Sequence, residues 1–251
     1  MNNPLRDGFA QQGVQTAAGI DEGLRAYMLK VYNYMALGLA ITGIAAMGLF
    51  QLAVVQDASG AIVGLTSIGE AIYTSPLRWV IMLAPLGAVF FLSFRIQSMS
   101  VGAAQMTFWV FAAIMGASLS SIFMVYTAES ITRVFFITAA AFGGLSLWGY
   151  TTKKDLSGWG SFLIMGLIGV IIASLVNIFL QSSALQFAVS VIGVLVFAGL
   201  TAYDTQRIKE MYYVGDDGTA MGRKAIMGAL SLYLNFINMF IMLLQLFGSR
   251  E

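Results

Sequence analysis

Asp204 is the residue whose type and position most clearly suggest chemistry. It follows an apolar run that begins near Ala184, so a carboxylate closes a segment that otherwise suits hydrocarbon. An ionised Asp costs about 2.5 to 3.5 kcal/mol at the centre of an inserted helix and less toward the interface, so it needs water or a partner there. Two interpretations are open: Asp204 is a protonatable functional group, or it ends the helix and caps the next loop.

A few other polar side chains lie inside apolar segments, and each is expected to turn away from lipid. Asn235 and Asn238 are three residues apart, so they share one face of a helix that protein is expected to surround. They could form hydrogen bonds between helices, at about 0.6 kcal/mol each, or contact an ion. The secondary polar candidates beside Asn238 are Asn177 and Gln105.

Arg95 and Asp204 both fall at the inner ends of predicted membrane spans, so an ion pair across the helix bundle is possible. Removal of the charge on one partner would leave the other uncompensated, and protonation of Asp204 would therefore weaken such a latch. The alternative is that Arg95 extends to lipid phosphates and keeps its charge in the interface.

The chain contains no Cys and no His, which excludes several classes of enzyme and cofactor site. Disulfides, zinc sites with Cys or His ligands, haem ligation by His, and Ser/His or Cys/His catalysis all need one of these side chains. We therefore expect no enzymatic activity and no bound cofactor. A permeant ion that meets carboxylate and amide oxygens stays compatible with the composition.

The overall composition predicts an all-α polytopic membrane protein. Of the 251 residues, 59% are hydrophobic and only 10% are charged, which is more apolar surface than a soluble core of this size could bury. The formal net charge of +1 gives no field that would attract nucleic acid, so we expect no nucleic-acid partner.

Seven segments are long and apolar enough to cross about 30 Å of hydrocarbon as helices. Residues 1–24 are expected to form a mobile polar tail, and residues 25–251 one seven-helix transmembrane domain. An acidic loop at 51–73 is expected to join the first two spans. The predicted spans are 31–52, 77–94, 101–126, 134–151, 161–180, 184–203 and 225–247.

The distribution of Lys and Arg predicts the orientation in a cell (inner) membrane. With the N-terminus in the cytoplasm and the C-terminus outside, most of the 13 Lys and Arg residues lie on the cytoplasmic side. The outer side then carries Asp57, Glu70 and Glu129. The basic residues assigned to the cytoplasmic side are Arg6, Arg25, Lys30, Arg95, Lys153, Lys154, Arg207, Lys209, Arg223 and Lys224.

Two segments resemble the signatures of the Bax inhibitor family, also called the transmembrane Bax inhibitor motif family. The first is Val196-Phe-Ala-Gly-Leu-Thr-Ala-Tyr-Asp-Thr-Gln-Arg-Ile-Lys209, and the second is Ala229-Leu-Ser-Leu-Tyr-Leu-Asn-Phe-Ile-Asn-Met-Phe240. The resemblance covers about residues 25–248. It implies a bacterial member in which six helices pack around the C-terminal seventh, and a pH-dependent leak of Ca²⁺ across the membrane.

The resemblance also implies a site around Asp204. In family members thought to sense pH, a second Asp on the last helix faces the first, and an Arg at the inner end of the second span latches onto the pair. Here Asn235 stands in place of the second Asp, and Arg95 matches that Arg to within about one residue. Asp204 and Asn235 are then the expected transient Ca²⁺ contacts, and Asp204 with Arg95 the expected gate or latch.

Replacement of the second Asp by an amide has a consequence for gating. An amide lacks the repulsion of a second carboxylate, so we expect weaker gating near neutral pH than in a two-Asp relative. On the predicted span boundaries, Asn235 lies about 15 Å deeper than Asp204 by helix rise, whereas the family pattern brings the two together.

Two functions are consistent with these features. The first is a passive, proton-sensitive cation leak, with Ca²⁺ as the permeant ion and Asp204 at its core. The second is a non-conducting membrane regulator that binds another membrane protein, such as a quality-control protease, a role also found among bacterial relatives. One membrane carboxylate offers little for coupled solute transport. In either role we expect a monomer in the lipid bilayer.

Overall fold

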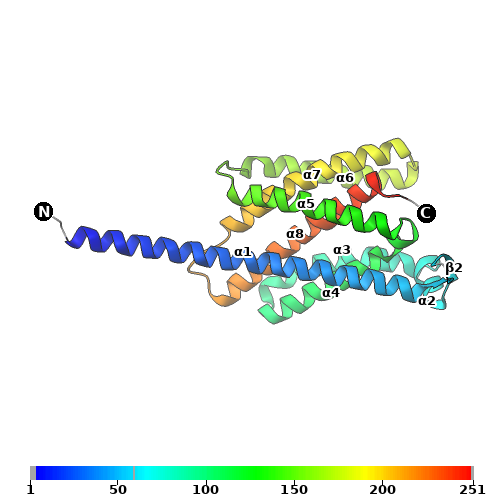
Figure 1. The fold of residues 1–251 in the computed structure, drawn as a ribbon, viewed down its shortest axis with the longest axis horizontal. Coiled ribbons are helices and arrows are strands. Elements are labelled where there is room, and N and C mark those ends of the chain that lie inside the picture. The colour runs from blue at the N-terminus through cyan, green and yellow to red at the C-terminus, as the bar shows by residue number, and fades with distance from the viewer. Residues whose placement is uncertain (1–3, 59, 250–251) are drawn as a thin grey trace.

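Apolar helices account for nearly the whole architecture. The computed structural model describes residues 4–58 and 60–249, with side chains described from Glu22 onward. Seven helices in this part of the chain are long and apolar enough to cross a membrane, which confirms the all-α polytopic class. They are α1 (Pro4–Ala53), α3 (Leu77–Arg95), α4 (Val101–Leu119), α5 (Ala128–Thr151), α6 (Ser157–Leu180), α7 (Ser183–Glu210) and α8 (Gly218–Phe247), shown in Figure 1.

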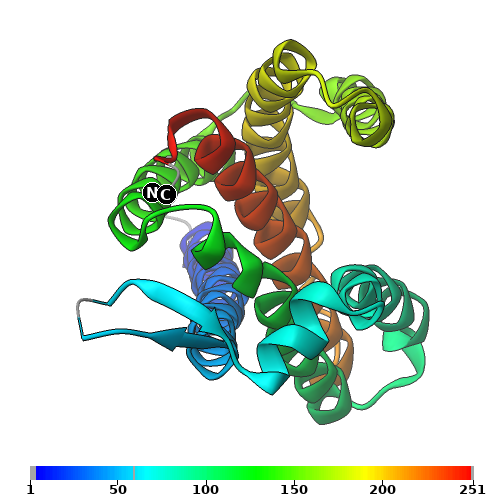
Figure 2. The same ribbon diagram turned by 90° about the vertical axis from the view of Figure 1, so that its right-hand side faces the viewer.

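The C-terminal helix α8 is the centre of the bundle. In its most apolar stretch 67% of the residues are buried, against 17% for α3 and 11% for α6. α8 packs on α7, α1, α5 and α4, while α3 packs chiefly on α4 and α6 on α7 (Figures 1 and 2). The prediction that the C-terminal helix lies at the centre of a seven-helix bundle is therefore confirmed; four helices pack on it, and α3 and α6 lie in an outer layer.

The outward surfaces of the helices are apolar, as a bilayer requires. Phe94 on α3 and Phe179 on α6 are 80% and 87% exposed, and such surface is stable against hydrocarbon rather than water. Trp79, Trp148 and Trp159 are exposed near helix ends, where indole rings commonly sit at the membrane interface.

Several helices extend beyond the predicted spans because polar side chains cap them. Asp217 accepts a hydrogen bond from the backbone N–H of Ala220 and begins α8 at Gly218, ahead of the predicted start at 225. α7 continues past Asp204 to Glu210. The interpretation in which Asp204 merely ends its helix is therefore wrong. Arg207 and Lys209 in the last turn of α7 favour this longer helix, since cations stabilise a helix C-terminus.

The predicted acidic loop at 51–73 is structured rather than irregular. It forms the antiparallel hairpin of β1 (Val54–Gln56) and β2 (Ile62–Leu65), the short helix α2 (Ser67–Gly69) and a π-helical turn at Glu70–Thr74. Gly60 lies in the hairpin turn with a φ of 86°, which favours glycine. Two 3₁₀ turns, Ile96–Ser98 and Ser120–Met124, follow α3 and α4.

The N-terminal part of α1 contains the predicted polar tail. The helix begins at Pro4 and runs without a break into the first membrane-spanning segment, Glu22–Ala53 (Figure 1). Residues 1–3, and the side chains up to residue 21, lie outside the described part of the chain. The division into a tail at 1–24 and a domain at 25–251 therefore stays a prediction. The two ends of the chain lie at opposite ends of the long axis.

Candidate functional site

Asp204 on α7 meets Asn235 on the central helix α8. The Nδ2 amide of Asn235 donates a hydrogen bond to Oδ2 of Asp204 at 2.7 Å. Asn235 is only 5% exposed and Asp204 is partly buried. The two side chains therefore meet, although the predicted span boundaries place Asn235 about 15 Å deeper in the membrane than Asp204. α8 crosses the bundle obliquely in Figure 1, so it advances less than 1.5 Å per residue along the bundle axis.

The amide of Asn235 suits a partner that can change its charge. An amide carries both donor hydrogens and an acceptor oxygen, whereas an ionised carboxylate only accepts. The observed bond therefore fits ionised Asp204. If Asp204 takes up a proton, a half-turn of the amide offers Oδ1 to the new O–H, so a hydrogen bond can join the two helices in both states.

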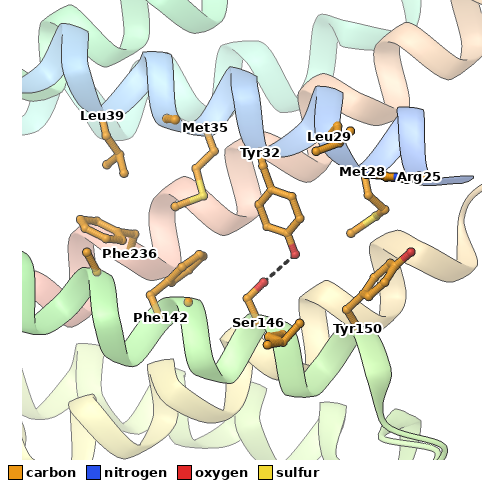
Figure 3. Close-up of a pocket in the computed structure, with 14 residues that line it drawn as sticks. Arg25, Met28, Leu29, Tyr32, Met35, Leu39, Phe142, Ser146, Tyr150 and Phe236 are labelled. Carbon is orange, nitrogen blue, oxygen red and sulfur yellow. Dashed lines mark hydrogen bonds between the residues drawn. The ribbon is translucent and has the colours of Figure 1, made fainter.

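A chain of hydroxyl groups crosses the bundle beside this pair. Thr205 donates to the carbonyl of Thr201 at 2.7 Å, so it accepts from Ser146 on α5 at 2.9 Å. Ser146 in turn accepts from the hydroxyl of Tyr32 on α1 at 2.7 Å (Figure 3). Ser146 and Thr205 are buried, and the chain links α1, α5 and α7. Sequence reasoning missed these residues, although Thr205 directly follows Asp204 in the first family segment.

The C-terminal end of α7 is also fixed to the link between α5 and α6. Gln206 donates to the carbonyl of Lys154 and accepts from the backbone N–H of Leu156, both at 2.8 Å. Lys209 donates to the carbonyl of Tyr150 at 2.9 Å. The charged link between α5 and α6, which contains Lys153, Lys154 and Asp155, is thus bonded to the helix that carries Asp204.

The expected latch between Arg95 and Asp204 is not formed in this arrangement. Arg95 is exposed at the end of α3, and the ion pair found among the described residues is Lys224–Asp216 at 2.5 Å. The physical reason is the position of α3, which packs chiefly on α4 in the outer layer. The cation whose charge acts on Asp204 is Arg207 on the same helix. An exposed Arg95 fits the alternative in which it extends to lipid phosphates.

The secondary polar residues make bonds away from Asp204. Asn238 donates to the carbonyl of Leu234 on its own helix at 2.8 Å. Gln105 on α4 accepts from the hydroxyl of Tyr34 on α1 at 3.3 Å. Asn177 bonds to Gln186 and to the N–H of Ser182, and so holds the turn between α6 and α7. Of the predicted amides, Asn235 is the one joined to Asp204.

Known proteins match nearly the whole chain. The family model described as "Inhibitor of apoptosis-promoting Bax1" matches residues 24–251. The chain belongs to the Bax inhibitor family. The two segments that carried the resemblance lie on α7 and α8, and each supplies one partner of the Asp204–Asn235 bond.

Similar members of the Bax inhibitor family occur in several bacteria. An uncharacterized protein of Caulobacter vibrioides is 48% identical over 233 residues, which cover 92% of each chain. The inner membrane protein YbhL of Escherichia coli is 46% identical over 232 residues, covering 91% of this chain and 94% of YbhL. An uncharacterized protein of Deinococcus radiodurans is 37% identical over 241 residues, covering 96% of this chain and 98% of its own. With its seven apolar helices, this Bax inhibitor family member is a multi-pass inner membrane protein.

Proposed function

We propose that this Bax inhibitor family protein is a passive, pH-sensitive cation leak, with Ca²⁺ as the permeant ion and Asp204 as the protonatable gate residue. The observation that carries the proposal is the 2.7 Å hydrogen bond from Asn235 to Asp204, which places a carboxylate against the central helix of an apolar bundle. The core around α8 is complete within one chain, which supports a monomer as the working unit.

The contacts of Asp204 indicate how a proton would act. Within the described residues, the side chains that act on Asp204 are Asn235 from α8 and Arg207 from α7. Protonation removes the negative charge that attracts a cation, but a half-turn of the Asn235 amide preserves a bond between the helices. The loss of charge then dominates, so cation flux should fall as the solution is made more acidic.

The ligands at this position suit conduction better than storage. Ca²⁺ prefers about six to eight oxygen ligands, and Asp204 with Asn235 offers only part of such a shell. Among the residues with described side chains, no group of three or more His, Cys, Asp or Glu could hold a metal ion. A weak contact releases an ion quickly. Movement of one elementary charge across 100 mV is worth about 2.3 kcal/mol, so inward movement of the doubly charged Ca²⁺ releases about 4.6 kcal/mol. A leak therefore needs no energy source.

We propose an orientation with the N-terminus in the cytoplasm and the C-terminus outside. The loops at the N-terminal end of the bundle are rich in Lys and Arg, and cytoplasmic loops commonly carry that excess. At the opposite end of the bundle, Asp57 lies in the hairpin, Glu70 in the π-helical turn that follows it, and Glu129 in the first turn of α5. A cation entering from outside would then meet an acidic mouth before it reaches Asp204.

The test is Ca²⁺ flux into liposomes that contain a Ca²⁺-sensitive dye and the purified full chain. Asp204→Asn should reduce the flux several-fold at alkaline pH and abolish its pH dependence over about pH 4 to 8. Glu210→Gln is the matched control, since it removes an exposed carboxylate from the end of the same helix and should leave the profile unchanged. Equal, pH-dependent flux in wild type and Asp204→Asn would refute the proposal. No flux in any chain would leave the non-conducting regulator as the remaining function.

A further inference from the structure

A cleft of about 600 Å³ lies between α1 and α5, and neither Asp204 nor Asn235 lines it. Its two walls are the facing sides of these helices, and Phe236 of α8 forms part of its floor (Figure 3). Leu29 on one rim and Leu147 on the other are 51% and 63% exposed. The cleft therefore opens sideways, toward the space that lipid fills in a membrane.

The cleft is long enough to hold an acyl chain from one leaflet of a bilayer. Arg25 lies at one end and Leu39 near the other, as Figure 3 shows. The fourteen steps between them on α1 span about 21 Å at 1.5 Å per residue. The hydrocarbon core of a bilayer is about 30 Å thick, so the cleft runs from one interface to slightly beyond the midplane. An acyl chain from that leaflet would follow the same course.

The volume of the cleft favours a single acyl chain over a protein helix as its occupant. A helix about 10 Å across would occupy roughly 1,600 Å³ along the same 21 Å, which exceeds the 1230 Å³ of empty space in the cleft and its mouth. Between its two ends the cleft is lined by apolar side chains and by the hydroxyls of Tyr32 and Ser146, which bond to each other, since Tyr32 donates to Ser146 at 2.7 Å. Neither of these two hydroxyls is therefore left without a hydrogen-bond partner beside a hydrocarbon chain.

The interfacial end of the cleft carries positive charge. Arg25 is exposed there, and in the described part of the chain no ion pair engages it. Tyr150 also lines this end, and Nζ of Lys209 lies 5.2 Å from the centre of its ring. Among the residues with described side chains, no carboxylate lines the cleft; Glu22, one turn before Arg25, is exposed outside it. A guanidinium is well suited to a phosphate, because its planar fork of N–H donors can bind two phosphate oxygens.

We propose that this cleft is a binding site for an anionic phospholipid, with one acyl chain between α1 and α5 and the headgroup phosphate at Arg25. This inference does not rest on the proposed cation leak. An apolar chain fills the groove, and the net positive end selects a headgroup with net negative charge over a zwitterionic one.

The test uses native mass spectrometry of the full chain in detergent, with phosphatidylglycerol or phosphatidylcholine added at equal concentration. Gly143→Leu should fill the cleft, because a Cβ at Gly143 meets nothing within 4 Å. Gly144→Leu is its matched control, since Gly144 is equally open on the same helix but does not line the cleft. Ala36→Leu fills the cleft from the α1 wall, which keeps the test valid if one variant fails to fold.

Wild type should retain one phosphatidylglycerol, while Gly143→Leu and Ala36→Leu should retain several-fold less and Gly144→Leu the wild-type amount. Arg25→Gln should remove the preference for phosphatidylglycerol over phosphatidylcholine. Lys30→Gln, which removes an exposed cation from the same helix outside the cleft, should keep that preference. Equal retention in Gly143→Leu and Gly144→Leu, or no headgroup preference in wild type, would overturn the proposal. A second experiment places a photoreactive group at position Leu147 and crosslinks it in cell membranes. A protein-sized adduct, in place of a lipid-sized one, would also overturn the proposal.

Discussion

Asp204 has a hydrogen-bond partner that can adapt to either of its protonation states. In the structure the Asn235 amide donates to it at 2.7 Å, and Asn235 is almost fully buried on the central helix. Asn238, three residues further, bonds to the carbonyl of Leu234 on its own helix. Two amides that look equivalent in the sequence therefore have different tasks, one between helices and one within a helix.

This difference predicts unequal costs for the same substitution at the two amides. Asn235→Leu would leave the partly buried carboxylate of Asp204 without its donor, and loss of such a partner costs about 1 to 3 kcal/mol. Asn238→Leu removes only an extra bond to a carbonyl within its own helix, so it should cost less. The free energies of unfolding in detergent at neutral pH measure both. Equal losses would contradict the assignment of Asn235 as the partner of Asp204.

At the scale of elements, α5 and α7 approach closely beside Asp204. A Cβ at Gly149 would lie 2.3 Å from the carbonyl oxygen of Ala202, so α5 and α7 can pack at this distance only with glycine there. Gly144, on the same helix, faces open space. The sequence alone does not distinguish the two glycines.

Gly149→Ala should therefore lower the midpoint of thermal unfolding, because its methyl group would force backbone apart. Gly144→Ala is the control and should leave the midpoint unchanged or raise it, since Ala is a better helix former by up to about 1 kcal/mol. Circular dichroism melts in detergent compare the two. If Gly144→Ala proved the more damaging change, the packing of α5 on α7 described here would be wrong.

The helices could be predicted from the sequence, but their ends and their neighbours could not. Apolar length is a property of one segment, so all seven spans and the role of α8 follow from hydropathy and the family pattern. The continuation of α7 beyond Asp204 depends on Gln206 and its hydrogen bonds to the link between α5 and α6. The hairpin at 54–65 depends on a turn with Gly60. The distance of Arg95 from α7 depends on which helices pack together, which no single segment encodes.

At the scale of the whole molecule, an odd number of spans places the two termini on opposite sides. The native chain has no Cys, so single cysteines report on their own position alone. Val63 on β2 and Val214 in the α7–α8 link are 62% and 58% exposed. Val63→Cys should react with a membrane-impermeant maleimide on intact cells, and Val214→Cys only after permeabilisation. The reverse pattern would place the N-terminus outside.

The most direct test of the central claim, that the Asp204–Asn235 pair sets the pH response of a cation leak, is the pH profile of Ca²⁺ flux in Asn235→Asp. Two carboxylates at this distance repel and hold a proton between them, so the midpoint of the profile should move to higher pH by at least about one unit. Asn238→Asp, on the same helix but not bonded to Asp204, should keep the wild-type midpoint. A profile of Asn235→Asp that coincides with wild type, or an equal shift in Asn238→Asp, would contradict the account.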